Sequence, residues 1–377
     1  MLKLTPPMGW NSWNTFGENI NEQLILETAD AMVSLGLLEK GYEYLVIDDC
    51  WSQKERDPEG RLVPDPVKFP NGMKAVADYV HGKGLKFGMY SCAGNLTCAG
   101  YPGSFEYEFI DAETFAEWGV DFLKYDYCYH SPIIHGKYLY RRMGLALENC
   151  GRDILFSACS WGADETHEWI KETASSMWRS TGDIFDTWAS VKDLAKQQER
   201  LLPYTGVGCF NDMDMLIVGM YGKGNVGLKG CNDTQYKTHF SIWGLLGSPL
   251  MIGCDIRNIS PEASAILANT EIIRINQDRA CRQPVKLKGV MNNTDDLLIY
   301  SKQLDNGELA VGLFNLSDEK VTVRFNLDEL GLPKSTGKTL SMREVWTGQK
   351  VTVKNSTHTQ ELAPYDCAVF RAKVVDA

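Results

Sequence analysis

Five aspartates stand at the ends of segments that have the composition of buried strands, where their carboxylates could act together. Clustered carboxylates repel one another and need a metal ion, bound cations, or a polyol whose hydroxyl groups donate hydrogen bonds. The six histidines are dispersed, whereas tryptophans accompany the acids, which favours a sugar. The simpler alternative is that each acid caps a helix or pairs with a neighbouring cation. The acids are Asp48, Asp49, Asp126, Asp183 and Asp214, and the tryptophans are Trp13, Trp51 and Trp161.

Two of these acids have neighbours that suit them to cleaving a glycosidic bond. Lys124 and Asp126 are two residues apart on one predicted strand, so their side chains point to the same face. A lysine there is expected to lower the pKa of Asp126 and keep it ionised, as a nucleophile requires. Asp183 follows Arg179 and is the candidate acid, whose pKa would be raised by burial among aromatic residues and carboxylates. Retaining glycosidases hold such a pair about 5–5.5 Å apart.

Two short motifs point to other chemistries but lack the context that those chemistries need. Residues 222–227 match GxGxxG, yet no convincing helix follows and no acid lies about 20 residues further on, which favours a flexible loop over a dinucleotide site. Residues 212–214 resemble the DxD of metal-dependent sugar transferases, but no histidine accompanies them. We therefore expect no metal and no other cofactor. A DxD transferase and a sugar-binding protein without catalytic activity are the alternatives.

Strands and helices that alternate along the chain to about residue 280 must position these side chains. Residues 24–35 have helical spacing, with Asn21 as N-cap and Gly36 at the C-terminal end, and further helices are expected at 73–80 and 111–118. The alternation favours a closed (β/α)₈ barrel over an open doubly wound sheet, because a barrel brings all the polar strand ends to one face. The expected strands are 8–13, 42–47, 85–90, 122–125, 154–158, 177–181, 206–210 and 249–253.

The pattern changes after about residue 282. Residues 305–307, Asp-Asn-Gly, supply a hairpin turn between two apolar alternating segments. We therefore predict two domains, a catalytic barrel over 1–282 and a C-terminal antiparallel β-sandwich domain over 283–377. Its expected strands are 297–300, 309–315, 321–327, 351–353 and 367–370.

Charge and composition exclude some classes of partner. The net charge is −11 and no run of lysine or arginine occurs, which argues against a nucleic acid or an anionic membrane as partner. No apolar stretch approaches the roughly 18 residues of a membrane span. Residues 1–7 lack the apolar core of a signal peptide, so a cytoplasmic location is expected, with a secreted mature form left open. A homo-oligomer is also left open.

Six strings of residues, in order along the chain, resemble those of glycoside hydrolase family 27, which contains α-galactosidases and α-N-acetylgalactosaminidases. They cover the chain to about residue 280, and the trailing β domain also fits the family. The strings are Pro7-Met8-Gly9-Trp10-Asn11-Ser12-Trp13, Ile47-Asp48-Asp49-Cys50-Trp51, Thr97-Cys98-Ala99-Gly100-Tyr101-Pro102-Gly103-Ser104, Leu123-Lys124-Tyr125-Asp126, Trp178-Arg179-Ser180-Thr181-Gly182-Asp183 and Asn211-Asp212-Met213-Asp214-Met215.

The resemblance implies a role for each matching residue. Asp126 would be the nucleophile and Asp183 the acid/base of a retaining exo-glycosidase that needs no cofactor. Asp48 and Asp49 would hold the hydroxyls at C4 and C6 of a galactose-configured sugar. The remaining substrate contacts would be Lys124 beside the nucleophile, Arg179 at the 2-position, Trp13 and Tyr90 along the pocket, and Asp214 and Met215 on one side.

The resemblance also implies a disulfide. The chain has eleven cysteines, an odd number, so at least one is unpaired within the chain. Cys98 and Cys128 match a family disulfide that joins the loops after the third and fourth strands. Cys50 and Cys159 have no matching partners and are expected to be free thiols.

The segment after the fifth strand bears on which sugar is accepted. Animal α-galactosidases of this family carry Glu and, three residues on, Leu, where the α-N-acetylgalactosaminidases carry Ser and Ala. Here Ser160 and Ala163 flank Trp161 and Gly162 at that spacing, which suggests that α-N-acetylgalactosamine is accepted or preferred. Gly162 stands in place of a proline and allows a different loop path, so a strict α-galactosidase is the alternative. Asp48-Asp49 argues against a β-L-arabinopyranosidase. Partners would be α-galactosyl or α-N-acetylgalactosaminyl glycosides.

Overall fold

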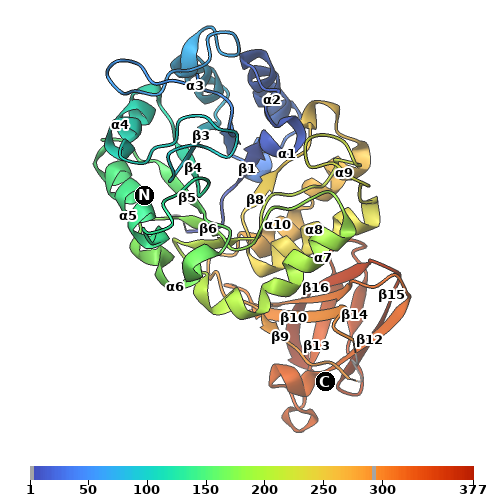
Figure 1. Ribbon diagram of the computed structural model, residues 1–377. Helices are drawn as coiled ribbons and strands as arrows, with labels where there is room; N and C mark the ends of the chain where they lie inside the picture. Colours follow the sequence, from blue (N-terminus) through green and yellow to red (C-terminus); the bar gives the residue numbers. More distant parts are fainter. Residues whose placement is uncertain (1–3, 291–293) are drawn as a thin grey trace.

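The computed structural model describes residues 4–290 and 294–377, which form a barrel and a smaller β domain beside it (Figure 1). Eight parallel strands form the barrel sheet in the order β7-β6-β5-β4-β3-β2-β1-β8. The ring closes just after β7, where Leu216 pairs in parallel with Ile252 of β8. This confirms the (β/α)₈ prediction. The strands are β1 Met8–Asn11, β2 Tyr44–Val46, β3 Lys86–Cys92, β4 Phe122–Asp126, β5 Leu155–Cys159, β6 Met177–Arg179, β7 Phe210–Asp212 and β8 Leu250–Ile252.

Helices surround the barrel, and their ends follow the predicted capping. The Asn21 side chain accepts the N–H of Leu24 at 2.9 Å, and Gly36 has a left-handed φ of 69° just past the last turn. The helices are α1 Trp13–Phe16, α2 Glu22–Ser34, α3 Gly72–Gly82, α4 Glu108–Trp118, α5 Gly136–Asn149, α6 Thr166–Trp169, α7 Trp188–Gln197, α8 Asp233–Leu246, α9 Pro261–Leu267 and α10 Thr270–Asn276. Short 3₁₀ turns are η1 Leu38–Lys40, η2 Ala163–Glu165, η3 Ile170–Glu172, η4 Glu199–Tyr204, η5 Ile256–Asn258, η6 Leu327–Leu330 and η7 Lys334–Thr336. No helix of the described ranges is both long and apolar enough to cross a membrane.

The seventh strand does not lie where the sequence placed it. Residues 206–210 were expected to form it, but β7 begins only at Phe210. Gly206 and Cys209 instead hydrogen-bond to each other, 3.1 Å from the N–H of Cys209 to the carbonyl of Gly206, around Gly208 with a left-handed φ of 82°. A tight turn therefore occupies the first four of the five residues of the predicted strand.

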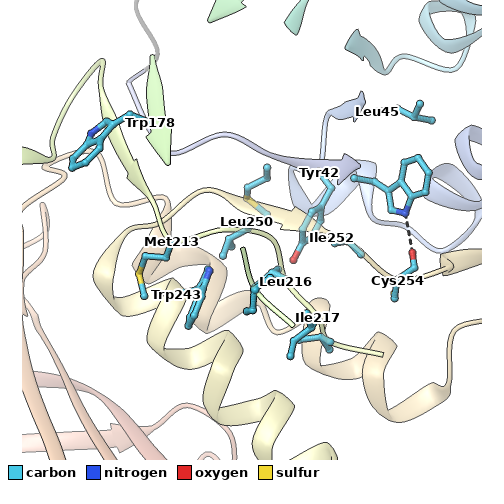
Figure 2. Close-up of a cluster of buried hydrophobic side chains, with 14 of the residues drawn as sticks. Tyr42, Leu45, Trp178, Met213, Leu216, Ile217, Trp243, Leu250, Ile252 and Cys254 are labelled. Atoms are coloured by element: carbon cyan, nitrogen blue, oxygen red, sulfur yellow. Dashed lines mark hydrogen bonds between the residues drawn. The ribbon is translucent and has the colours of Figure 1, made fainter. Parts of the chain in front are cut away.

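Buried aromatic and aliphatic side chains pack together between the barrel strands and α8 (Figure 2). Trp243 of α8 is fully buried, and its indole N–H donates to the carbonyl of Asp214 at 2.7 Å. Trp10 of β1 donates in the same way to the carbonyl of Cys254, at 2.8 Å, just after β8. Core side chains thus fix the backbone of two loops at the carboxyl ends of the strands.

The second domain is an antiparallel sandwich that packs against the barrel. A six-stranded sheet, β14-β13-β16-β11-β10-β9, faces the pair β12-β15 across a core that includes Val323, Phe325 and Phe370. On the barrel side, Trp346 donates to Ser241 of α8 at 3.1 Å, so the domain rests on the helix that carries Trp243. The strands are β9 Val285–Lys286, β10 Leu297–Gln303, β11 Leu309–Asn315, β12 Val321–Asn326, β13 Lys338–Glu344, β14 Lys350–Thr352, β15 Thr357–Leu362 and β16 Cys367–Asp376.

Candidate active site

Asp126 is the last residue of β4 and lies at the bottom of a cavity at the carboxyl end of the barrel, 6% exposed. Its Oδ2 accepts the hydroxyl of Tyr90 at 3.0 Å, and its Oδ1 accepts the backbone N–H of Tyr127 at 2.9 Å. Tyr90 is placed there by the parallel register, which pairs it with Lys124 on the neighbouring strand. The carboxylate is therefore held by two donors from two strands, with one orientation.

Lys124 lies on the same face of β4, as predicted, but its ion-pair partner is Asp48. The ammonium is 2.7 Å from Oδ2 of Asp48, which also accepts the amide of Asn11 at 2.7 Å. Asp49 is oriented separately, by the backbone N–H groups of Ala99 at 3.0 Å and Cys50 at 2.7 Å. Two carboxylates thus stand side by side with fixed and different hydrogen bonding, which suits recognition of two hydroxyl groups.

The pKa of Asp126 is raised, to about 6, where the sequence predicted that Lys124 would lower it. Burial is the largest cause, since removal of water disfavours the charged form, and the charge of Lys124 only partly offsets it. The sequence prediction considered the charge of Lys124 but not the burial of Asp126 at the end of β4. At neutral pH the group is still mostly ionised.

Arg179 organises the opposite wall. This last residue of β6 is 3% exposed, and its guanidinium lies 3.1 Å from Oδ1 of Asp183 and 3.1 Å from Oδ1 of Asp214. Nη2 of Arg179, the nitrogen that lies beside Asp183, also donates to the carbonyls of Thr181 and Gly182. These hydrogen bonds hold the loop after β6 in a tight turn. Arg179 therefore forms ion pairs with both Asp183, the candidate acid, and Asp214, which is expected to close one side of the cavity.

The prediction of a raised pKa for Asp183 is contradicted by the structure, in which its pKa is lowered. Burial opposes ionisation, but the charges of Arg179 and Lys124 outweigh it. The Asp183 side chain is 59% exposed, so water still solvates the carboxylate and the expected aromatic enclosure is missing. In the ligand-free protein the two carboxyl groups therefore have the reverse of the predicted order of pKa values.

Cys98 and Cys128 are joined by a disulfide, as the resemblance implied, and Cys50 and Cys159 are free. The bridge connects the loop after β3 to the loop after β4, and Cys98 Sγ lies 3.6 Å from Oδ2 of Asp126. These two sulfurs and the Asp126 carboxylate lie within 4.8 Å of one another, the spacing of metal ligands. Because the sulfurs are bonded to each other, they are not free thiolate ligands, and Cys98 forms part of the cavity wall.

Ser160 and Ala163, expected at the 2-position of the sugar, do not border the cavity, whereas Trp161 between them does. Ser160 is 1% exposed, and its hydroxyl lies 2.6 Å from that of Thr166. Trp161 has a left-handed φ of 57°, which is strained for a residue other than glycine and turns the loop over at this point. Gly162 also has a left-handed φ, of 82°, and continues the same turn. The loop therefore turns Trp161, and not Ser160 or Ala163, toward the cavity.

The cavity brings together most of the predicted residues, and two that the sequence analysis missed. Asn14 and Val226 also border it, Asn14 from the first turn after β1 and Val226 from the GxGxxG segment. Adjacency to Trp13 could have indicated Asn14, but Val226 lies far along the chain from any predicted strand end. Cys128 supports the wall from behind. The predicted residues that border the cavity are Trp13, Asp48, Asp49, Tyr90, Cys98, Lys124, Asp126, Trp161, Arg179, Asp183, Asp214 and Met215.

A larger groove, of about 850 Å³, opens at the other end of the barrel, around the first residues of β5, β6 and β7. In (β/α)₈ enzymes the chemistry is carried by the loops at the carboxyl ends of the strands. The candidate pair, Asp126 and Asp183, is at that end, and the groove contains neither of them.

Comparison with known proteins agrees with both domains. A family model described as Alpha galactosidase A matches residues 5–278, and a model of the α-galactosidase C-terminal β-sandwich domain matches residues 294–372. An α-galactosidase of Cyamopsis tetragonoloba is 43% identical over 370 residues, 98% of this chain and 86% of that protein.

Solved structures agree as well. α-Galactosidase I of Mortierella vinacea superposes with a TM-score of 0.91 at 33% identity, covering 98% of this chain and 97% of that one. An α-galactosidase of Saccharomyces cerevisiae with raffinose gives a TM-score of 0.89 at 30% identity, covering 99% of this chain and 98% of that one. The chain therefore belongs to the α-galactosidase family, glycoside hydrolase family 27.

Proposed function

We propose that this protein hydrolyses terminal α-D-galactosides with retention of anomeric configuration, with Asp126 as nucleophile and Asp183 as acid/base. The observation that carries the proposal is the placement of two carboxyl groups in contrasting surroundings on one cavity. Asp126 is buried and oriented by Tyr90, while Asp183 is exposed at the rim and held by Arg179. Retaining glycosidases use two carboxyl groups on one cavity, one to form the bond to C1 and one to protonate the leaving oxygen.

In the first step an oxygen of Asp126 forms a bond to C1 of the galactose while the bond to the glycosidic oxygen breaks. Asp183 gives its proton to that oxygen, and the aglycone leaves as an alcohol. In the second step Asp183 takes a proton from water, whose oxygen attacks C1 and releases Asp126 as a carboxylate. Two inversions give net retention. Tyr90 and the N–H of Tyr127 hold Asp126 in line during both steps.

The acid must gain its proton when substrate binds, because the pKa of Asp183 is lowered in the free protein. Two changes on binding act in that direction. The sugar displaces water from the exposed Asp183 carboxylate, and a hydroxyl at the 2-position draws part of the Arg179 guanidinium away from its ion pair with Asp183. Both raise the pKa of Asp183, so protonation of the acid is coupled to occupation of the cavity.

Galactose, with a hydroxyl at C2, is the sugar that the loop after β5 favours. Acceptance of α-N-acetylgalactosamine would need Ser160 to bind the acetamide and Ala163 to leave room for its methyl group. Ser160 is instead buried against Thr166, and the bulky Trp161 borders the cavity. We therefore favour an α-galactosidase with little activity on N-acetylgalactosaminides. Galactosyl oligosaccharides are the expected substrate class, and the yeast relative bound to raffinose supports this.

The experiment compares kcat/KM on nitrophenyl α-D-galactoside with that on the matching N-acetylgalactosaminide. A preference for galactose of more than about tenfold, or ~1.4 kcal/mol, supports this reading of the loop. Equal rates or a preference for the acetamide would overturn it. Proton NMR of the first-formed product tests retention: α-galactose is expected, and β-galactose would exclude the double displacement.

A further inference from the structure

Asn14 occupies a place in the cavity wall that none of the assigned roles explains. It lies in α1, directly after Trp13, and is 2% exposed. Together with Trp13 and Val226 it borders the cavity on the side of β1. Strand β1 lies beside β2, which leads to Asp48 and Asp49, and two strands separate it from β4, which carries Asp126.

The surroundings hold the Asn14 side chain in place. Its backbone carbonyl accepts the N–H of Val226 at 2.9 Å, and the Thr15 hydroxyl next to it donates to the carbonyl of Gly253 at 2.7 Å. A Cβ added at Gly253 would lie 2.9 Å from both Cβ and Nδ2 of Asn14, so the carboxamide is packed directly against the Gly253 backbone. Only a glycine after β8 leaves room for it.

The segment that carries Val226 is fixed as well. It contains the GxGxxG residues, which the structure shows to be a cavity wall. Asp186, fully buried, accepts the N–H of Gly222 at 2.7 Å and that of Cys231 at 3.0 Å, and its own N–H donates to the carbonyl of Val226 at 3.0 Å. Asp186 follows Asp183 by three residues, so the loop after β6 that carries Asp183 is hydrogen-bonded directly to the segment that carries Val226.

The amide nitrogen of Asn14 nevertheless lacks a partner. This Nδ2 is buried, and no hydrogen-bond acceptor for it occurs among residues 4–290 and 294–377. Leaving a buried donor unpaired destabilises a protein by about 1–3 kcal/mol, so such groups are normally satisfied. An unpaired amide that is rigidly packed at the edge of a polar cavity is suited to a hydroxyl group that arrives with the ligand.

We propose that Asn14 determines specificity for the hydroxymethyl group of the sugar by hydrogen bonding to the C6 hydroxyl. The inference rests on the proposed function, with C1 at Asp126, and on the roles that the family resemblance implies for Asp48 and Asp49 at the C4 and C6 hydroxyls. Asn14 stands beyond Asp49 on the side away from β4, where the C6 end of the ring would lie. Val226 and Trp13 supply apolar contact for the C6 methylene.

The test uses nitrophenyl α-D-galactoside and its 6-deoxy analogue, which differ only in the C6 hydroxyl. Asn14→Ala is expected to lower kcat/KM for the galactoside about 10- to 100-fold and that for the 6-deoxy analogue by no more than about twofold. The ratio of the two rates is taken within one preparation, so partial loss of folded protein cancels. An equal loss on both substrates would overturn the proposal.

Thr15→Ala is the matched control, because it removes a hydrogen bond of the same turn and no group of the cavity wall. It is expected to leave the ratio of the two rates unchanged; a change as large as that of Asn14→Ala would reduce Asn14 to a structural role. If the wild-type protein hydrolyses neither substrate, the proposed function fails. Calorimetric binding of D-galactose and 6-deoxy-D-galactose then gives the same ratio, and an unchanged ratio in Asn14→Ala would still refute the contact.

Discussion

The two walls of the cavity use the same kinds of residue, carboxylates and a cation, in opposite ways. On the β2–β4 wall, Asp48, Lys124 and Asp126 belong to strands or follow them directly, and their carboxylates are buried and fully oriented. On the β6–β7 wall, Asp183 lies four residues beyond its strand and is held only at one oxygen by Arg179. Burial raises the pKa of Asp126, whereas burial of Asp183 is outweighed by the charges of Arg179 and Lys124, which lower its pKa. Depth in the cavity and the neighbouring cations together thus separate the two carboxyl groups.

Removal of the buried carboxylate is expected to have the largest effect. Asp126→Ala should lower kcat on any α-galactoside by on the order of 10⁴-fold or more, because no other group can form the bond to C1. The loss should be similar for nitrophenyl and oligosaccharide substrates. Steady-state rates with both substrates, and a thermal unfolding curve to confirm folding, check this. Residual activity above about 1% of the wild-type rate would show that Asp126 is not the nucleophile.

Removal of the exposed carboxyl group should depend on the leaving group. Asp183→Ala is expected to lower kcat/KM on a galactosyl oligosaccharide by about 10²–10⁴-fold, because an alkoxide leaves poorly without a proton. Nitrophenolate leaves without one, so the first step on the nitrophenyl galactoside should suffer much less. Pre-steady-state rates on both substrates measure the difference. Equal losses on the two would mean that Asp183 is not the acid.

The pH dependence tests both walls at once. The reaction needs one proton on the pair, carried by Asp183, and the pair loses its last proton as the pH rises through about 6. Below the lowered pKa of Asp183 the pair gains a second proton. We therefore expect kcat/KM, which reports the free enzyme, to be highest below pH 6 and to fall by up to about tenfold per pH unit above it. A profile that stays flat from pH 6 to 8 would contradict a pair that loses its last proton near pH 6.

The smallest effect on catalysis is expected at the loop after β5. Ser160→Glu should bury an extra charged group where Ser160 meets Thr166, which destabilises the fold by about 1–3 kcal/mol and lowers Tm. The ratio of galactoside to N-acetylgalactosaminide rates should change little. Trp161→Ala, which alters a residue that borders the cavity, should change it more. A shift of the ratio in Ser160→Glu at unchanged Tm would place Ser160 at the sugar.

The sequence was sufficient where position along a strand decides the outcome. Strand ends meet at one face of a barrel, so Asp126 and Lys124 were located by their strand, whereas the role of Arg179 came from the family resemblance. Prediction from the sequence failed where the burial of a side chain depends on the path of a loop. The exposure of Asp183 depends on how the turn after β6 wraps around Arg179, and the burial of Ser160 depends on Thr166. Neither contact has a pattern in the sequence.

Two of the three strands missed in the second domain, β13 and β15, have a common cause. Both are rich in polar residues and expose several side chains, so their apolar content does not set them apart from loops. The third, β9, has only two residues. β11, buried over six of its seven residues, was located with its observed ends. Strands covered on both faces were therefore easier to predict than strands with one face in water.

The central claim, that Asp126 forms a bond to C1 of the sugar, is tested most directly by trapping that bond. A fluorinated α-galactosyl fluoride, which forms the glycosyl-enzyme ester and releases it slowly, should add one galactosyl group, found by mass spectrometry on the peptide that contains Asp126. Asp126→Asn should remain unlabelled under the same conditions. Labelling of Asp183 or of any other residue, or the absence of an adduct in an enzyme that turns over the reagent, would contradict the account.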